Sequence, residues 1–293
     1  MENIEYEIKY AIEHMMENNY PRKELWNMDS KVPGLLSGIR AGDDAVVLGK
    51  SVYNMEGPYP LILGSKTALI HTSCDVVAMG ARPLYAMDAI QASNEEEIKI
   101  AIDGLKKQSI GLDIPIIGGN TQTVESLKSC LSVVVFGELI TEKIIKDSGS
   151  KDNDIMIMLG HPVEGDIGER VQKAKNKYET FLELVSSGIE VHACKDASRG
   201  GWLCNILEML LKAEKGVLIN SMPYPRATRY LGTYLVSIPE YELPNVLEIA
   251  MKKRCPVMPF GVVTSEKILK IGNKEYITKE RMNELIKNFP YKY

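Results

Sequence analysis

A long, almost wholly apolar segment constrains the fold of this chain most strongly. Residues 65–81 are rich in Ala, Leu, Ile, Val and Met and predict a helix that is buried on most sides. Asp75 lies inside this segment, where an unpaired carboxylate would be costly to remove from water. Asp75 therefore needs a partner. That partner is either a buried hydrogen bond or salt bridge, or a magnesium ion bound directly or through water.

The rest of the chain alternates short apolar runs with amphipathic segments. In the first half, the pattern predicts strands at 45–48, 61–63, 84–92, 114–117 and 131–136, and helices at 4–19, 65–81 and 93–111. In the second half, it predicts strands at 155–159, 191–194, 217–219, 233–238 and 257–263, and helices at 169–187, 202–213, 243–253 and after 278. This alternation indicates a mixed α/β (α+β) fold.

Length and composition favour two packed domains. A chain of 293 residues exceeds the usual size of a domain with a single core. Polar residues crowd 146–154, with Ser148-Gly149-Ser150 in the middle. We therefore expect an N-terminal domain over 1–150 and a C-terminal domain over 151–293.

Charge and cysteine content exclude several classes of partner. The net charge of −4 gives no basic field for a nucleic-acid backbone. No apolar run is long enough to cross a bilayer, and the acidic first residues do not resemble a secretory signal. The five cysteines are widely spaced and odd in number, which indicates reduced thiols. We expect a cytoplasmic protein without nucleic-acid or membrane partners.

Two short polar segments lie next to predicted strands. Gly42-Asp43-Asp44 precedes the strand at 45–48, and Gly118-Gly119-Asn120-Thr121 follows the strand at 114–117. Two carboxylates beside a glycine can hold Mg²⁺ together with substrate phosphates. Ligands also favour the carboxyl ends of strands in α/β sheets. Taken alone, Gly42-Asp43-Asp44 favours an ordinary turn, and the alternative for residues 118–121 is a strand-to-loop turn, so neither segment identifies a site by itself.

A third polar segment, residues 195–201, joins a predicted strand to a predicted helix. Asp196 can bind a metal, and Arg199 can clamp phosphate oxygens. Gly200 and Gly201 leave backbone N–H groups open at the start of the helix. The alternative is a plain helix N-cap formed by Ser198 or Asp196.

Taken in order, these segments resemble the aminoimidazole-ribonucleotide (AIR) synthase, or PurM-like, superfamily. That superfamily includes thiamine-monophosphate kinase, selenophosphate synthetase and the hydrogenase maturation factor that dehydrates a carbamoyl group. The similarity spans most of the chain and rests on residues 42–45, 74–83, 118–121 and 196–201. Four ordered matches are far more specific than any one of them.

The resemblance implies a fold, two cofactors and a set of site residues. The N-terminal domain would dimerise through its sheet into a shared barrel, the C-terminal domain would be α/β, and ATP would bind in the cleft between them. The implied magnesium or phosphate-site residues are Asp43, Asp44, Asp75 and Asp196. The wider ATP-binding set adds Lys66, Gly118, Gly119, Asn120, Thr121, Ser198 and Arg199.

Some positions depart from the superfamily pattern. Asn120 replaces an acidic residue and offers a carbonyl ligand without charge, which lowers the expected metal affinity. The loop at 196–201 looks closest to the hydrogenase maturation branch, yet the chain ends at 288–293 without the cysteine that accepts the carbamoyl group. An archaeal branch of AIR synthase-related proteins, similar to markers of methanogens, fits better.

These features predict an ATP-dependent enzyme that transfers a phosphoryl group to an oxygen of a small molecule or carbonyl-like group. Such an enzyme would be a kinase, ligase or dehydratase-like transferase. The alternative is a non-catalytic nucleotide-binding maturation protein with a protein partner, which Asn120 and the missing terminal cysteine motivate. Arg226 and Arg229 are nominated as contacts for an anionic substrate, although their segment is equally consistent with a surface turn.

Overall fold

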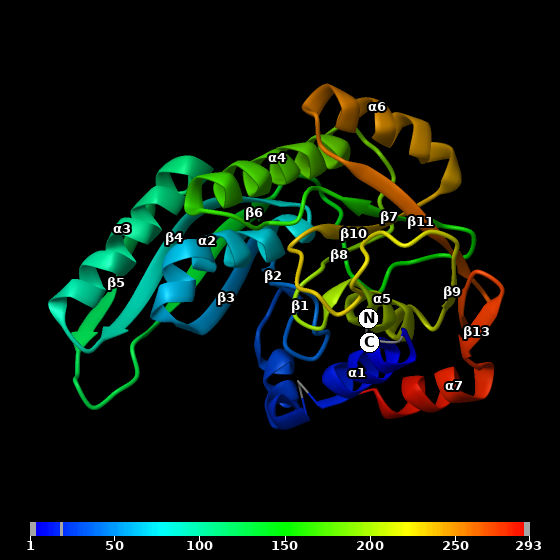
Figure 1. Ribbon diagram of the computed structural model, residues 1–293, viewed down its shortest axis with the longest axis horizontal. Coiled ribbons are helices and arrows are strands. Elements are labelled where there is room, and N and C mark those ends of the chain that lie inside the picture. The colour runs from blue at the N-terminus through cyan, green and yellow to red at the C-terminus, as the bar shows by residue number, and fades with distance from the viewer. Residues whose placement is uncertain (1–3, 18–19, 290–293) are drawn as a thin grey trace.

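The computed structural model describes residues 4–17 and 20–289, and within them the chain forms two β-sheets that lie side by side (Figure 1). The first sheet has the strand order β1-β2-β3-β6-β4-β5. Neighbouring strands are antiparallel except for the parallel pair β4 and β5. Its strands are β1 (Leu35–Ser37), β2 (Val46–Leu48), β3 (Ser51–Pro60), β4 (Ala81–Ala92), β5 (Ile116–Thr123) and β6 (Cys130–Leu139).

Two helices cover one face of the first sheet. Helix α2 (Leu61–Ala78) packs against β3, β4 and β6, and α3 (Glu95–Leu112) packs beside α2. The side chains of β6 alternate, so Leu131, Val133 and Val135 are buried under α2. Because α2 is enclosed by the sheet on one side and by other helices, including α3, it is apolar on nearly all sides, as its sequence predicts.

The second sheet has the order β13-β12-β9-β11-β7-β10-β8 and is covered on both faces. Along β7, Ile157 and Leu159 belong to one buried cluster, while Met156 and Met158 belong to another. This double burial explains the continuous apolar run of the strand. The strands are β7 (Ile155–Leu159), β8 (Ala193–Asp196), β9 (Gly216–Ile219), β10 (Tyr234–Ile238), β11 (Val257–Thr264), β12 (Leu269–Ile271) and β13 (Lys274–Ile277).

Helices from both ends of the chain complete the second unit. On one face, α5 (Gly201–Ala213) is flanked by α1 (Ile4–Glu17) and α7 (Lys279–Asn288). On the other face, α4 (Ile167–Ser186) packs against α6 (Leu243–Lys253) and also against α2 and α3, so it ties the two sheets together. Short 3₁₀ helices lie at η1 (Tyr20–Lys31) and η2 (Glu240–Glu242).

The mixed α/β prediction is confirmed, and most predicted elements lie within a few residues of the observed ones. The strand predicted at 61–63 is wrong, because these residues form the first turn of α2 after Pro60. The preceding strand, β3, was not predicted, since its polar residues and the pair Gly57-Pro58 hide its extended conformation. Residues 118–121 were expected in a loop, but they continue β5 to Thr123.

Two further expectations can be compared with the structure. None of the helices in the described part of the chain is long and apolar enough to span a membrane. All five cysteines, Cys74, Cys130, Cys194, Cys204 and Cys255, are free.

Candidate metal centre

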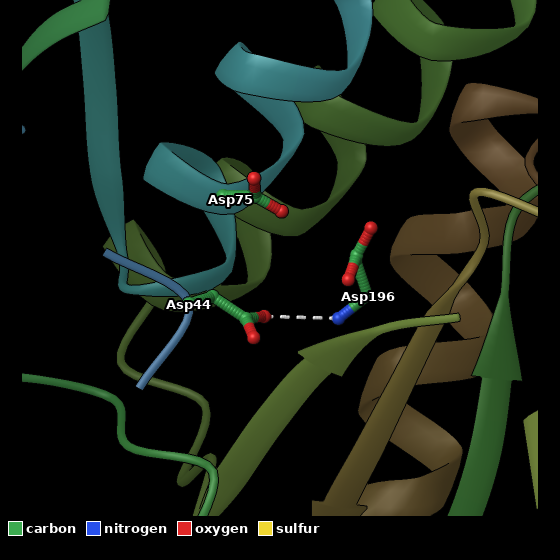
Figure 2. Close-up of side chains that lie close together, drawn as sticks. All are labelled: Asp44, Asp75 and Asp196. Atoms are coloured by element: carbon green, nitrogen blue, oxygen red, sulfur yellow. Dashed lines mark hydrogen bonds between the residues drawn. The ribbon is translucent and has the colours of Figure 1, made fainter. Parts of the chain in front are cut away.

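Three carboxylates from separate elements meet where the two sheets adjoin (Figure 2). Asp44 lies in the turn before β2, Asp75 on α2, and Asp196 at the end of β8. One carboxylate oxygen from each lies within 4.8 Å of one from each of the others. We call this group the aspartate cluster. It joins residues that are up to 152 positions apart, so the folded arrangement of both sheets is needed to form it.

Hydrogen bonds fix two of these carboxylates. Asp44 accepts through Oδ2 from the backbone N–H of Asp196, at 3.0 Å, and through Oδ1 from Lys195 Nζ, at 2.7 Å. Asn54 of β3 donates to Asp75 Oδ2, at 2.5 Å. Each carboxylate oxygen can accept a second bond, so these contacts orient the ligands without using up their capacity for a cation.

The electrostatics of the aspartate cluster favour a bound cation. Burial, followed by the charge of Asp196, raises the pKa of Asp75 well above its ordinary value. Burial and then the charge of Asp44 raise the pKa of Asp196 to about 7, although Lys195 opposes this effect. Buried carboxylates that repel one another are the ordinary setting for a divalent ion. Because all three ligands offer oxygen, the donor set fits Mg²⁺.

A network of buried ion pairs contacts the aspartate cluster through Asp44. Burial lowers the pKa of Lys195, but Asp44, Glu208 and Asp147 outweigh this effect and raise it well above the ordinary value. Lys212 reaches Asp147 at 2.5 Å and Glu208 at 3.1 Å. Both lysines therefore form buried ion pairs that are structural parts of the interface between the two sheets.

The side chain of the neighbouring residue, Asp43, makes its hydrogen bonds outside the aspartate cluster. It accepts a hydrogen bond from Ser37 Oγ, at 2.6 Å, and one from the backbone N–H of Asp147, at 3.4 Å. Although it lines the same cavity, it is not a member of the aspartate cluster. The structure thus separates the two acidic residues that the sequence presents as a pair.

The segment after β8 begins α5 through glycines rather than through a side-chain cap. The N-cap is Gly200, with a φ of 84°, and it has no side-chain capping bond. The alternative of an N-cap formed by Ser198 or Asp196 is therefore wrong. Ser198 and Arg199 instead line the cavity above the aspartate cluster.

A cavity of about 940 Å³ opens above the aspartate cluster. Its volume lies at the upper end of the range of small-molecule sites. It is lined on one side by α1 and α5, and on the other by β3 and α2. Side chains that sequence reasoning did not select also line it, among them Asn54, Tyr59, Lys195 and Tyr230.

Other nominated residues do not line this cavity. Lys66 is exposed on α2, and residues 118–121 are exposed on β5. Arg226 and Arg229 are also exposed, and Arg229 pairs with Glu164 and with Tyr224 Oη. Within this single chain, the structure brings together the motif residues of 42–45, 75 and 196–199, but not those of 118–121.

The sequence points with different strength to the cavity-lining residues that were not selected from it. Lys195 adjoins Asp196 in a segment that had already been selected, so its proximity to the carboxylates was the easiest to anticipate. Asn54 and Tyr59 belong to β3, whose strand character was not recognised. Tyr230 lies in an irregular segment before β10, and no pattern of spacing singles it out.

The fold and the site define an AIR synthase-type, PurM-like two-domain protein, and the chain belongs to the AIR synthase related family. The N-terminal domain of that family matches residues 42–139, and its C-terminal domain matches residues 135–272. The chain is 66% identical over 294 residues to an uncharacterised protein of Methanocaldococcus jannaschii, with 100% of this chain and 99% of the relative covered.

More distant similarity reaches much longer proteins. Phosphoribosylformylglycinamidine synthase subunit PurL of Thermoanaerobacter sp. is 24% identical over 251 residues, which cover 73% of this chain and 34% of the relative. The chain thus spans about a third of the length of that relative.

Solved structures share the fold. T. maritima PurL complexed with ATP superposes with a TM-score of 0.74 at 19% identity, covering 96% of this chain and 50% of that chain. A HypE–HypF complex gives a TM-score of 0.68 at 17% identity, with 82% of this chain and 94% of that chain covered.

Proposed function

We propose that this protein binds a magnesium nucleotide, with ATP as the nucleotide, and uses it for phosphoryl transfer to an oxygen of a small molecule. The observation that carries the proposal is the aspartate cluster, in which Asp44, Asp75 and Asp196 lie within 4.8 Å of one another beneath a cavity of about 940 Å³. Hard oxygen ligands below a cavity of this size suit a magnesium ion and the phosphates it carries.

The chain's own residues have distinct roles in this proposal. The aspartate cluster holds Mg²⁺, which neutralises charge on the transferring phosphoryl group. Lys195 orients Asp44 and balances its charge. Ser198 and Arg199 line the cavity beside the start of α5 and are positioned to contact phosphate oxygens. Catalysis would then come mainly from positioning and charge neutralisation.

Related structures support ATP as the nucleotide. T. maritima PurL has been solved in complex with ATP and with ADP, and both structures share the fold of this chain at TM-scores of 0.74 and 0.75. This chain covers only 50% of the first PurL chain and 52% of the second. The phosphoryl acceptor of this protein is therefore not inferred from the PurL structures.

Calorimetric titration of the purified protein with MgATP, followed by an assay for ADP release with candidate acceptors, tests the proposal. Asp75→Asn should abolish the magnesium-dependent part of binding. Asp103→Asn is a matched control, because Asp103 is an exposed carboxylate on α3 that pairs with Lys107, away from the cavity. Absence of both MgATP binding and ADP release in the unaltered protein would remove the proposal.

We also propose a homodimer through the first sheet. Opposite residues on antiparallel strands share a face, so Met55, Val134 and Met87 form one row. Met55 is 68% exposed and Met87 is 39% exposed, which leaves apolar surface on the side away from α2. A second copy would cover this surface, and sedimentation analysis of the unaltered protein and of Met87→Asp, which lies outside the cavity, tests the assignment.

A second candidate function is a nucleotide-binding maturation protein that acts through a protein partner. The position of Asn120 favours it, since this residue lies exposed on β5 and outside the cavity. A structural neighbour is the HypE–HypF complex, so assembly with another protein has a parallel in this fold. ATP binding without turnover would support this candidate, whereas steady turnover abolished by Asp75→Ala would exclude it.

Other sequence predictions keep the status of proposals. These are the domain division at 150/151, the substrate contacts Arg226 and Arg229, the phosphate contact Lys66 and the cytoplasmic location. The metal-ligand role predicted for Asp43 is an alternative to the aspartate cluster, and Asp43→Asn tests it. Titration of Arg229→Ala with anionic metabolites tests the substrate role. Loss of affinity for the metabolite, with MgATP binding retained, would support it.

A further inference from the structure

Three aromatic rings form one wall of the cavity, beside the aspartate cluster. Tyr59 lies near the end of β3, His71 lies on α2, and Tyr230 precedes β10. The ring centroids of His71 and Tyr230 are 4.6 Å apart, and those of Tyr59 and His71 are 5.9 Å apart. We call these three residues the aromatic wall. None of them has a role in the proposed binding of phosphate or metal.

Hydrogen bonds hold the imidazole of His71 in one orientation. Tyr59 Oη donates to Glu56 Oε2, at 2.9 Å, so it can only accept from His71 Nδ1, 3.4 Å away. The other nitrogen, Nε2, then accepts from Thr67 Oγ1, at 2.7 Å. Both ring nitrogens are therefore engaged, and the imidazole is left to make contacts through its faces and carbon edge.

The aromatic wall is uncharged at neutral pH. Burial, reinforced by the charges of Lys177 and Arg170, lowers the pKa of His71 to about 3. Burial likewise raises the pKa values of Tyr59 and Tyr230 above their ordinary value, so both phenols stay protonated. The rings thus offer neutral surfaces for stacking.

The surroundings select neither sign of charge for a ligand at this wall. Lys177 and Arg170 act on His71, whereas the acidic groups Glu56 and Asp196 act on the nearby Asp75, so charges of both signs lie around the wall. Arg170 is held by the backbone carbonyls of Gly165, at 2.8 Å, and Val163, at 3.1 Å. A flat, uncharged group therefore suits the wall best.

Tyr230 supplies an independent indication that the wall is a binding surface. Its Oη is buried and has no hydrogen-bond partner among the described residues. A buried donor without a partner costs free energy, and such groups in folded proteins are usually satisfied by water or a ligand. Because the ring lines the cavity, a bound molecule can reach the same region.

We propose that Tyr59, His71 and Tyr230 form a subsite for a flat, uncharged heteroaromatic ring, adjacent to the metal centre but separate from it. Two molecules can supply such a ring: the base of the bound nucleotide, or a separate acceptor that lies beside it. The choice between these sources rests on the proposed nucleotide function, whereas the subsite itself does not.

Binding of three probes tests the subsite by calorimetry. Adenosine without metal carries the ring but no phosphate, magnesium tripolyphosphate carries phosphate but no ring, and MgATP carries both. Tyr230→Leu removes the stacking ring, and Tyr230→Phe removes only Oη. Tyr241→Leu is the control, because Tyr241 is 66% exposed and bonds to Glu190 outside the cavity. Thermal unfolding establishes that each variant is folded.

The proposal expects Tyr230→Leu to weaken adenosine binding about tenfold or more, as stacking of a base on an aromatic side chain implies. Magnesium tripolyphosphate should bind unchanged, and Tyr230→Phe should retain most of the adenosine affinity. If MgATP weakens in parallel, the ring is that of the nucleotide. If MgATP is unaffected and adenosine still binds to the MgATP-saturated protein, the ring belongs to a separate acceptor.

Several results would overturn the subsite. They are no adenosine binding by the unaltered protein, equal losses for all three probes in Tyr230→Leu, or a loss in Tyr230→Phe as large as that in Tyr230→Leu. Adenosine binding that depends on Tyr230, without any magnesium-dependent binding of tripolyphosphate or ATP, would instead overturn the proposed function and leave the subsite in place.

Discussion

Lys195 Nζ lies 2.7 Å from Asp44 Oδ1, and both side chains are almost fully buried, at 7% and 5% exposed. The pair joins a turn of the first sheet to a strand of the second. This lysine is a counter-charge in direct contact with the aspartate cluster, so it both stabilises the interface and orients one candidate metal ligand.

Replacing this lysine should therefore destabilise the protein in a way that magnesium reverses. Lys195→Met leaves Asp44 and Asp147 buried with less compensation, and removal of one partner from a buried pair costs about 3–5 kcal/mol. Thermal unfolding with EDTA should show a large loss, and Mg²⁺ should raise the Tm of the variant more than that of the unaltered protein. Lys50→Met, which breaks an exposed pair with Glu142, should change little. Equal effects of the two variants would contradict the role of Lys195.

Asp75→Asn and Asp43→Asn should have opposite effects on magnesium affinity and on stability. Asp75 belongs to the aspartate cluster, and burial with neighbouring charge disfavours its ionised form, so the amide should lower magnesium affinity by at least about tenfold while raising metal-free stability at neutral pH. Asp43 bonds to Ser37 and to the backbone of Asp147, so its amide should lower stability and leave magnesium affinity nearly intact. Titration calorimetry with Mg²⁺ and urea unfolding measure the two effects. Loss of magnesium binding in Asp43→Asn would instead support the sequence prediction that Asp43 is a ligand.

The metal-free protein should lose stability as the pH rises from about 4 to about 7. Burial and the charge of Asp44 raise the folded-state pKa of Asp196 to about 7, whereas an unfolded aspartate titrates near 3.9. Between these values the folded state binds the extra proton, so each pH unit removes at most about 1.4 kcal/mol per carboxyl. Urea unfolding in EDTA across this range measures the slope, and Asp196→Asn should flatten it. An unchanged slope in Asp196→Asn would show that Asp196 does not carry this pH dependence.

Much of this site was predictable from local sequence, because three of its carboxylates lie in short recognisable segments. Asp75 is conspicuous as a charge within an apolar helix, and Asp196 lies in a glycine-containing strand-to-helix connection. The turn that holds Asp43 and Asp44 gave no information about which of its two carboxylates belongs to the aspartate cluster. Only the partners of each side chain, Ser37 for Asp43 and Lys195 for Asp44, separate them.

Features that depend on contacts between distant segments were not predictable. Lys212 reaches the backbone carbonyl of Gly42 across 170 positions, and no local pattern distinguishes it from a solvent-exposed lysine at the end of a helix. The aromatic wall likewise draws one ring each from β3, α2 and the segment before β10. Strand β3 was missed because a central glycine and proline conceal its extended conformation, so Asn54 and Tyr59 were not considered.

Gly201 should tolerate no side chain, because its backbone closely approaches the segment that carries Tyr230. At Gly201, with a φ of 77°, a Cβ would lie 2.1 Å from the carbonyl oxygen of Ala227. Gly188 has a similar φ of 80° but open space around it, so Gly188→Ala isolates the backbone strain from the steric clash. Gly201→Ala should therefore lose clearly more stability than the roughly 1 kcal/mol expected at Gly188. The clash should also shift the segment after Ala227 and weaken adenosine binding, which Gly188→Ala should leave unchanged. Urea unfolding and calorimetry of the two variants measure both effects. Equal stabilities would show that residues 227–228 relax away from a new Cβ at no cost.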